Sequence, residues 1–129
     1  MRSAETVERL LAALRARDGE AVAALLHPEV EATGDKGTFE GVDAVVGWAK
    51  PSDDGHLVSS VEVDEIREVG DHHVALAARR QWRWKEHPDD VADEAPFGVL
   101  FEFRDGKVFR WRQNFPSIID AIDAIPADR

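Results

Sequence analysis

The order of residue patterns along the chain predicts an α+β fold, because helical periodicity fills the first half and strand periodicity the second. Apolar residues recur at helical spacing three times before residue 50, and from Leu57 onward they alternate with polar residues. Two further strands, over residues 95–115, are joined by Arg104-Asp105-Gly106. If the sheet curls around the helices, its inner face and the first helix enclose a cone. We therefore expect a cone-shaped, curved antiparallel sheet wrapped on N-terminal helices.

Three stretches predict the N-terminal helices. The first has Ser3 as its N-cap, the second is capped by Asp18 and stopped by Pro28, and the third covers residues 42–49. Each carries an apolar stripe that would pack on a sheet. The stripes are Val7, Leu10, Leu11 and Leu14, then Val22, Leu25 and Leu26, and then Val42, Val45, Val46 and Ala49, with Trp48 at the flank of the last.

Strands are predicted between and after these helices. Residues 30–33 and 38–40 form a short hairpin, and a long strand covers residues 73–85. The acidic segment 86–94 reads as a polar connector between that strand and the next. The capping-box-like sequence that starts at Ser117 opens a final short helix. That helix presents Ile118, Ile119, Ile122 and Ile125.

The turn at Arg104-Asp105-Gly106 decides which aromatic side chains share a face. A three-residue loop with a left-handed, bulged Gly106 pairs Phe103 with Lys107. A two-residue turn would instead place Phe101 beside Arg110, so we expect the three-residue loop. One face then collects Phe97, Val99, Phe101, Phe103, Phe109, Trp111 and Phe115, interrupted only by Gln113. Such a face suits a deep apolar pocket with one orienting amide, or a filled core whose Gln113 bonds to backbone.

Arg80 interrupts the apolar face of the strand over residues 73–85. That face consists of Val74, Leu76, Ala78, Trp82 and Trp84. A buried guanidinium needs a partner, because an unpaired buried charge costs on the order of several kcal/mol. A ligand carboxylate, enolate or phenolate could be that partner, or Arg80 could reach an edge and pair in solvent, or bond Gln113 and backbone carbonyls.

Two matters stay open at this point. A register slip of one residue would turn Arg79 and Gln81 inward in place of Arg80, since neighbouring side chains on a strand point to opposite faces. Candidates for proton transfer are His56, which follows a loop that could overhang the pocket, and Asp35, at a turn. We predict no metal site and no cofactor.

The composition excludes several classes of function. A chain of 129 residues reads as one domain, 1–129. A net charge of −10 and a pI of about 4.9, without a compact basic run, argue against a nucleic-acid partner. No apolar stretch approaches the roughly 20 residues of a membrane span, and no signal-peptide pattern opens the chain, so we expect a cytoplasmic protein. Without cysteine or tyrosine, thiolate and phenol chemistry are closed to it.

Several short segments, in this order and spacing, resemble the nuclear transport factor 2-like superfamily and, within it, the SnoaL-like group. The resemblance covers roughly residues 3–125. The segments are Leu10-Leu11-Ala12-Ala13-Leu14 followed by Asp18, Leu25-Leu26-His27-Pro28-Glu29-Val30, Phe39-Glu40-Gly41, Val69-Gly70-Asp71, and Asp105-Gly106-Lys107-Val108-Phe109-Arg110-Trp111-Arg112. The resemblance implies a cystatin-like α+β barrel with a pocket between the curved sheet and the first helix, in a homodimer formed through the sheet. The group spans ketosteroid isomerases, limonene-epoxide hydrolases, polyketide cyclases and dehydratases, besides non-catalytic domains.

The residues at the family's catalytic positions depart from those chemistries. The position that matches the isomerases' tyrosine is about Leu10, and the one that matches their base falls near Gly34. Ala32 and Gly34 replace the epoxide hydrolases' tyrosine and asparagine, and Gln113 replaces their last-strand carboxylate. The arginine–aspartate pair on their middle long strand has no complete counterpart here. The chain therefore looks like a pocket without the family's best-known machinery.

We expect a pocket protein that binds a small apolar molecule with an oxygen function, with isomerase-, cyclase- or dehydratase-like activity left open. The alternative is a non-catalytic dimerisation or accessory domain whose cavity its own aromatic residues fill. The residues expected to bind the ligand are Arg80, Trp82, Phe97, Val99, Phe101, Trp111, Gln113, Leu14 and Trp48.

Overall fold

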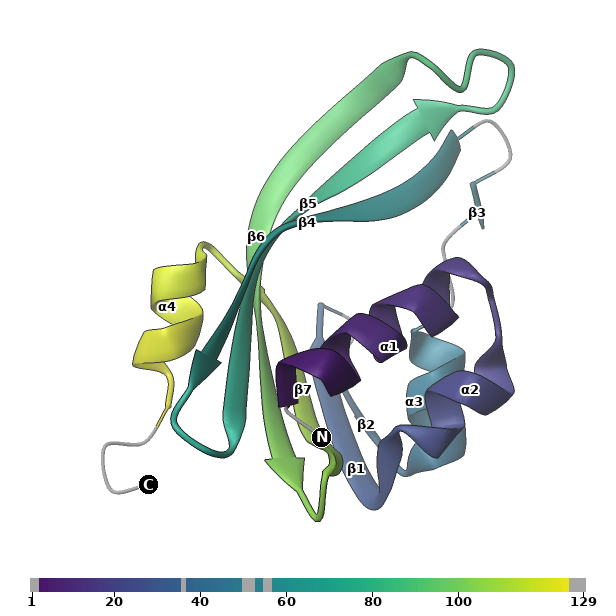
Figure 1. Ribbon diagram of the computed structural model, residues 1–129. Helices are drawn as coiled ribbons and strands as arrows, with labels where there is room; N and C mark the ends of the chain where they lie inside the picture. The colour runs from purple at the N-terminus through teal and green to yellow at the C-terminus, as the bar shows by residue number, and fades with distance from the viewer. Residues whose placement is uncertain (1–2, 36, 50–52, 55–56, 126–129) are drawn as a thin grey trace.

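The computed structural model describes residues 3–35, 37–49, 53–54 and 57–125 and has an α+β architecture (Figure 1). Helices α1 to α3 lie on one face of a single curved sheet, and α4 lies on the other. The helices are α1 (Ser3–Arg15), α2 (Gly19–Ala24), α3 (Val42–Trp48) and α4 (Ile118–Asp123). The strands are β1 (Leu26–Gly34), β2 (Gly37–Glu40), β3 (Asp53–Asp54), β4 (Leu57–Val69), β5 (His73–Trp84), β6 (Val91–Arg104) and β7 (Lys107–Phe115). The expected fold class is confirmed.

In the described part of the chain, seven strands form an open sheet in the order β2-β1-β7-β6-β5-β4-β3. Neighbouring strands run antiparallel, except that β1 pairs with β7 in parallel, so the sheet is mixed rather than wholly antiparallel. The long strands β4, β5 and β6 bend partway along and continue as an arm that extends past α1 (Figure 1). A bulge between Val63 and Glu65 falls in β4 and increases the local twist.

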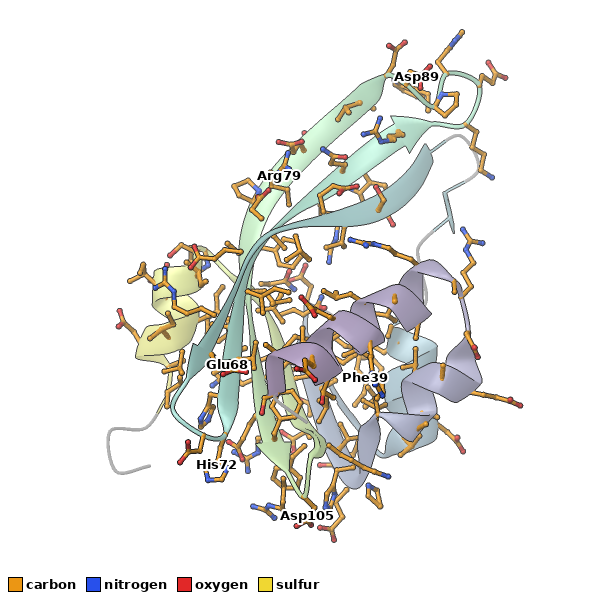
Figure 2. All side chains as sticks on the ribbon, viewed as in Figure 1. Phe39, Glu68, His72, Arg79, Asp89 and Asp105 are labelled. Atoms are coloured by element: carbon orange, nitrogen blue, oxygen red, sulfur yellow. The ribbon has the colours of Figure 1, made fainter. Side chains whose placement is uncertain are left out.

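The core lies between the concave face of the sheet and α1 to α3, where Figure 2 shows side chains gathered. The stripe predicted for α1 is the one that packs: Val7 and Leu10 are fully buried. Val45 of α3 is equally buried, as its spacing predicted. None of the helices described is long and apolar enough to cross a bilayer.

Two helix ends differ from expectation. Ser3 is the first residue of α1 and not its cap, whereas Asp18 does cap α2, accepting a hydrogen bond from the backbone N–H of Ala21 at 3.1 Å. Helix α2 ends at Ala24, and Pro28 lies within β1 instead of ending the helix. Pairing of β1 with β7 overrides the helical pattern, and the pairing shifts register around Pro28, which cannot donate to a ladder.

The tip of the β6–β7 hairpin is tighter than predicted. The loop has two residues, Asp105 and Gly106, with φ of 55° and 76°, the pattern of a type I′ turn. The bulge follows on β7, because Phe103 pairs with Val108 while Glu102 pairs with Arg110. Phe109 is the extra residue of the bulge. Val108 is therefore buried in the core, in the place that was expected for Phe109.

The far end of β7 also departs from the predicted aromatic face. Asn114 has a φ of 67°, and Phe115 beyond it packs with Leu100 and Ala121 on the opposite face of the sheet. Helix α4 covers that face. Ser117 caps the N-terminus of α4, because its Oγ accepts a hydrogen bond from the backbone N–H of Asp120 at 3.2 Å. Of its predicted apolar residues, Ile118, Ile122 and Ile125 pack on the sheet and Ile119 stays exposed.

The segment expected as a polar connector is partly a strand. Strand β6 begins at Val91, and its first residues pair with the end of β5, as in Gln81 with Glu94. Side chains there remain exposed, which is why the sequence showed no strand alternation. Asp89 lies at the tip of the resulting arm (Figure 2).

Candidate ligand-binding cavity

A cavity of about 490 Å³ opens between the helices and the concave side of the sheet. Residues from α1, the turn after it, β1, α3, β4, β5 and β7 line it. Its apolar wall includes Leu11, Leu14, Trp48, Ala49, Trp82 and Trp111. Its charged and amide groups include Arg15, Arg17, Asp35, Glu62, Arg80 and Gln113.

Six of the nine residues expected to bind a ligand line this cavity. They are Leu14, Trp48, Arg80, Trp82, Trp111 and Gln113. Phe97, Val99 and Phe101 do not, because they are buried in the same core cluster as Val7 and Leu10 of α1. The aromatic face is therefore divided into a packed part and an open part.

The alternation of β5 decides which arginine faces the cavity. Leu76 and Ala78 belong to the concave core, and Arg80 and Trp82 continue that row into the cavity lining. Arg79 points to the opposite face (Figure 2), where its Nε donates to Asp64 at 2.8 Å. The hydrogen bond and the charge of Asp64 raise the pKa of Arg79 above its ordinary value.

Arg80 has an aromatic neighbour but forms no ion pair with an acid in the part of the chain that the structure describes. Its guanidinium carbon lies 5.1 Å from the centroid of the Phe97 ring, within the range of a cation–π contact. Within the described residues, no Asp or Glu forms an ion pair with it. Glu65 of the neighbouring strand β4 accepts a hydrogen bond from Nε of Arg67 at 2.7 Å. A half-buried guanidinium left in this state has its donors available to a ligand anion.

Gln113 is oriented by a neighbour two residues earlier on the same strand face. Trp111 Nε1 donates to Gln113 Oε1 at 3.1 Å. The Trp111 ring meets the Trp48 ring edge-on at 5.1 Å between centroids and the Phe101 ring at 5.2 Å. The amide is therefore held beside an aromatic wall that packing has made rigid.

Leu10 and Gly34, which the resemblance matches to the isomerases' tyrosine and base, provide neither an acid nor a phenol. Leu10 is fully buried in the core. A Cβ at Gly34 would lie only 3.0 Å from Cζ2 of Trp48, so the indole occupies the space that a side chain at that position would need. Asp35 lines the cavity and is exposed, and His56 lies outside the described residues.

Sequence reasoning missed part of the lining. Leu11 was assigned to the first helical stripe without being placed at the cavity, and Ser59 comes from β4, where strand alternation alone carried no signal of an opening. Arg17 and Asn114 line the cavity from left-handed backbone conformations, with φ of 56° and 67°. Because such conformations normally call for glycine, periodicity could not have found these two residues.

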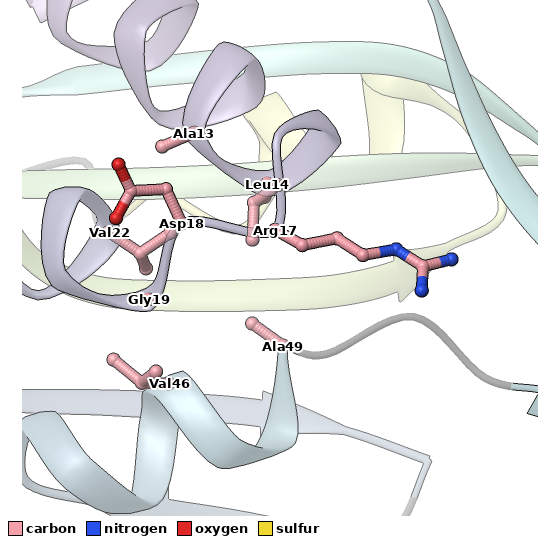
Figure 3. Close-up of a pocket in the computed structure, with 8 residues that line it drawn as sticks. All are labelled: Ala13, Leu14, Arg17, Asp18, Gly19, Val22, Val46 and Ala49. Carbon is pink, nitrogen blue, oxygen red and sulfur yellow. The ribbon is translucent and has the colours of Figure 1, made fainter.

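A second, smaller cavity of about 230 Å³ shares part of its lining with the first, and Figure 3 shows the residues that line it. It lies between the end of α1, the start of α2 and α3, and it shares Leu14, Arg17 and Ala49 with the larger one. Figure 3 shows the Arg17 side chain extending away from the other residues that line it. The two cavities therefore have Arg17 as a common lining residue.

Comparisons with solved structures support the fold. An NTF2-like protein of unknown function from Burkholderia pseudomallei K96243 is 22% identical over 98% of this chain and 100% of its own, with a TM-score of 0.70. A putative polyketide cyclase from Sinorhizobium meliloti is 16% identical over 85% of this chain and 94% of its own, with a TM-score of 0.68. An LEH-like epoxide hydrolase from M. tuberculosis is 19% identical over 94% and 86%, with a TM-score of 0.64.

Among curated proteins, no sequence matches this chain significantly. The sequence profile of the SnoaL-like domain, in contrast, matches residues 7–111, which is most of the chain. The matched segment runs from the buried face of α1 to Trp111 in the cavity wall. The chain belongs to the SnoaL-like domain family and has the NTF2-like fold also found among cyclases, isomerases and epoxide hydrolases.

Proposed function

We propose that this protein binds a small hydrophobic molecule carrying an oxygen function, and that Arg80 and Gln113 recognise that oxygen. The observation that carries the proposal is the state of Arg80: a guanidinium in an aromatic-lined cavity, against the ring of Phe97, with no acid partner in the described part of the chain. A ligand carboxylate, enolate or phenolate would supply the missing partner, and Trp82 and Trp111 would cover the apolar body.

The cavity volume supports a ligand of small-molecule size. About 490 Å³ lies within the range typical of small-molecule sites, whereas a core filled by its own aromatic residues would leave far less space. Trp48 and Trp111 pack against each other in the wall and leave this volume unfilled. This favours a binding protein over an accessory domain with a self-filled cavity.

If the protein catalyses a reaction, the activation barrier would be lowered by stabilisation of the negative charge that develops on the ligand oxygen. Arg80 and the Gln113 amide would do so in the manner of an oxyanion hole. Proton transfer would fall to Asp35, which lines the cavity, or to His56. Isomerase-, cyclase- and dehydratase-like reactions all fit this description.

The test is a thermal-shift screen against aromatic and terpenoid acids, followed by calorimetric titration of the compounds that raise Tm. Arg80→Gln should weaken binding of the tightest-binding acid about tenfold or more, because a charge-assisted contact is lost. Arg79→Gln is the matched control: it removes the neighbouring arginine on the opposite face and should leave affinity unchanged.

The screen also separates the two classes of function. Absence of a Tm shift with every hydrophobic acid would overturn the proposal in favour of the accessory domain. Equal affinity of Arg80→Gln and the unaltered protein for the same acid would overturn the role of Arg80 in recognising the ligand oxygen. The homodimer through the sheet stays a prediction. Its measurement is the mass in solution by light scattering, alone and with a compound from the screen.

A further inference from the structure

Three non-glycine residues of the described chain have left-handed backbone conformations: Arg17, Asp105 and Asn114. Asp105 lies in the two-residue turn, which requires positive φ. Asn114 turns the chain so that Phe115 reaches the opposite face, and asparagine tolerates this conformation. For Arg17, in contrast, the backbone conformation gives no reason for an arginine side chain.

Arg17 ends α1 in the arrangement known as the Schellman motif. The N–H of Asp18 donates to the carbonyl of Ala13 at 3.0 Å, and the N–H of Arg17 donates to that of Leu14 at 3.2 Å. The left-handed residue of this motif is usually glycine, because any Cβ is strained there. The motif uses only the backbone of Arg17, so the fold by itself favours glycine over arginine at this position.

The helix dipole does not account for Arg17 either. A helix C-terminus favours a nearby cation, but Arg15, in the last turn of α1, already provides one. In the described part of the chain, no Asp or Glu forms an ion pair with Arg17. The strained position therefore presents a guanidinium that pairs with none of the described acids.

The electrostatics of the cavity lining give that guanidinium a role. Among the described residues, the lining holds three arginines, Arg15, Arg17 and Arg80, against two acids, Asp35 and Glu62, although the chain as a whole carries a net charge of −10. Arg80 is half-buried, whereas Arg17 is exposed and lines both cavities. An elongated ligand that reached both would meet one cation inside the cavity and another near solvent.

We propose that Arg17 is a specificity-determining residue that binds a second anionic group, a carboxylate, at the solvent end of the ligand. This inference rests on the proposed function, in which Arg80 holds the oxygen group inside. The ligand class then becomes a hydrophobic molecule with acidic oxygen functions at opposite ends. A monoacid would bind through Arg80 alone.

The test uses three pairs of aromatic acids of increasing length, built on benzene, naphthalene and biphenyl. Each pair is the monocarboxylate and the dicarboxylate with its groups at opposite ends. For the pair of matching length, calorimetry should show the diacid binding about threefold to tenfold tighter than the monoacid. Arg17→Gly should abolish this difference in affinity and leave the affinity for the monoacid unchanged.

Stability provides an independent readout. Because glycine suits the left-handed position, Arg17→Gly should keep Tm equal or raise it by up to about 5 °C, so weaker binding could not be attributed to unfolding. Asp105→Gly relieves the same strain far from the cavity, and Arg9→Gln removes an exposed arginine of α1 outside the lining. Both should retain the diacid advantage, and Arg17→Lys should retain most of it.

The outcomes separate the two proposals. If diacids of every length bind Arg17→Gly as tightly as the unaltered protein, Arg17 is only a helix end and this inference is overturned, while the role of Arg80 stands. If no monoacid or diacid binds the unaltered protein, the proposed function fails and the role of Arg17 falls with it.

Discussion

The indole Nε1 of Trp111 donates a hydrogen bond to Oε1 of Gln113 at 3.1 Å, on the wall of the larger cavity. Because an indole N–H can only donate, this contact uses the amide oxygen of Gln113 and orients its NH₂ group as a donor. Trp111 is in turn packed against Trp48 and Phe101. The pair thus gives the cavity a hydrogen-bond donor whose orientation is set by the protein.

Replacing Trp111 by phenylalanine should disorder this amide. We expect Trp111→Phe to weaken binding of an acid from the screen about threefold to tenfold and to lower the free energy of unfolding by about 1–3 kcal/mol. Titration calorimetry and denaturant unfolding measure the two effects. Trp48→Phe removes a similar volume but keeps the hydrogen bond, so equal losses of affinity in both variants would show that the hydrogen bond is unimportant.

Phe101 and Trp82 should separate stability from binding. Phe101 is 1% exposed, beneath the cavity, so Phe101→Leu should lower the free energy of unfolding by about 1.5 kcal/mol and change affinity less than twofold. Trp82 lines the cavity, so Trp82→Leu should weaken binding of the acid and change the free energy of unfolding only slightly. Urea unfolding and titration with the same acid test both variants, and a strong loss of affinity in Phe101→Leu would contradict the boundary between core and cavity.

Gly98 should be the least replaceable glycine of the sheet. A Cβ there would overlap the carbonyl of Ser117, whose carbon would be 2.7 Å away, because α4 begins directly over the strand. Gly98→Ala should therefore cost about 2 kcal/mol of unfolding free energy. Gly47 of α3 has open space around its Cβ position, so Gly47→Ala should stabilise by about 0.5–1 kcal/mol. Thermal unfolding of the two variants should move in opposite directions.

A substitution at Gly19 tests whether the ligand extends into the smaller cavity. A Cβ at this first residue of α2 would reach ordinary contact distance, 3.5 Å, from Cγ1 of Val46 in α3. Gly19→Ala should raise the free energy of unfolding by about 0.5 kcal/mol. Gly19 lines only the smaller cavity, so ligand affinity should not change. A marked loss of affinity would mean that the ligand extends into the smaller cavity.

Local patterns in the sequence predicted much of the fold and part of the site. The buried stripe of α1, the caps at Asp18 and Ser117, and the alternation that turns Arg80 away from Arg79 all depend on neighbours a few residues apart. Periods of 3.6 and 2 are properties of the backbone, so sequence alone reveals them. The class of fold and six of the nine expected lining residues followed from them.

The tertiary structure decided what depends on contacts between distant segments. The bulge at Phe109 falls in a strand, β7, that pairs with both β1 and β6, and Phe97 and Phe101 are buried in the core cluster that α1 shares. The left-handed conformation of Arg17 leaves no periodic trace either. A residue's neighbours along the chain determine which way it points, whereas the elements packed against it decide whether that direction leads into the core or into an open cavity.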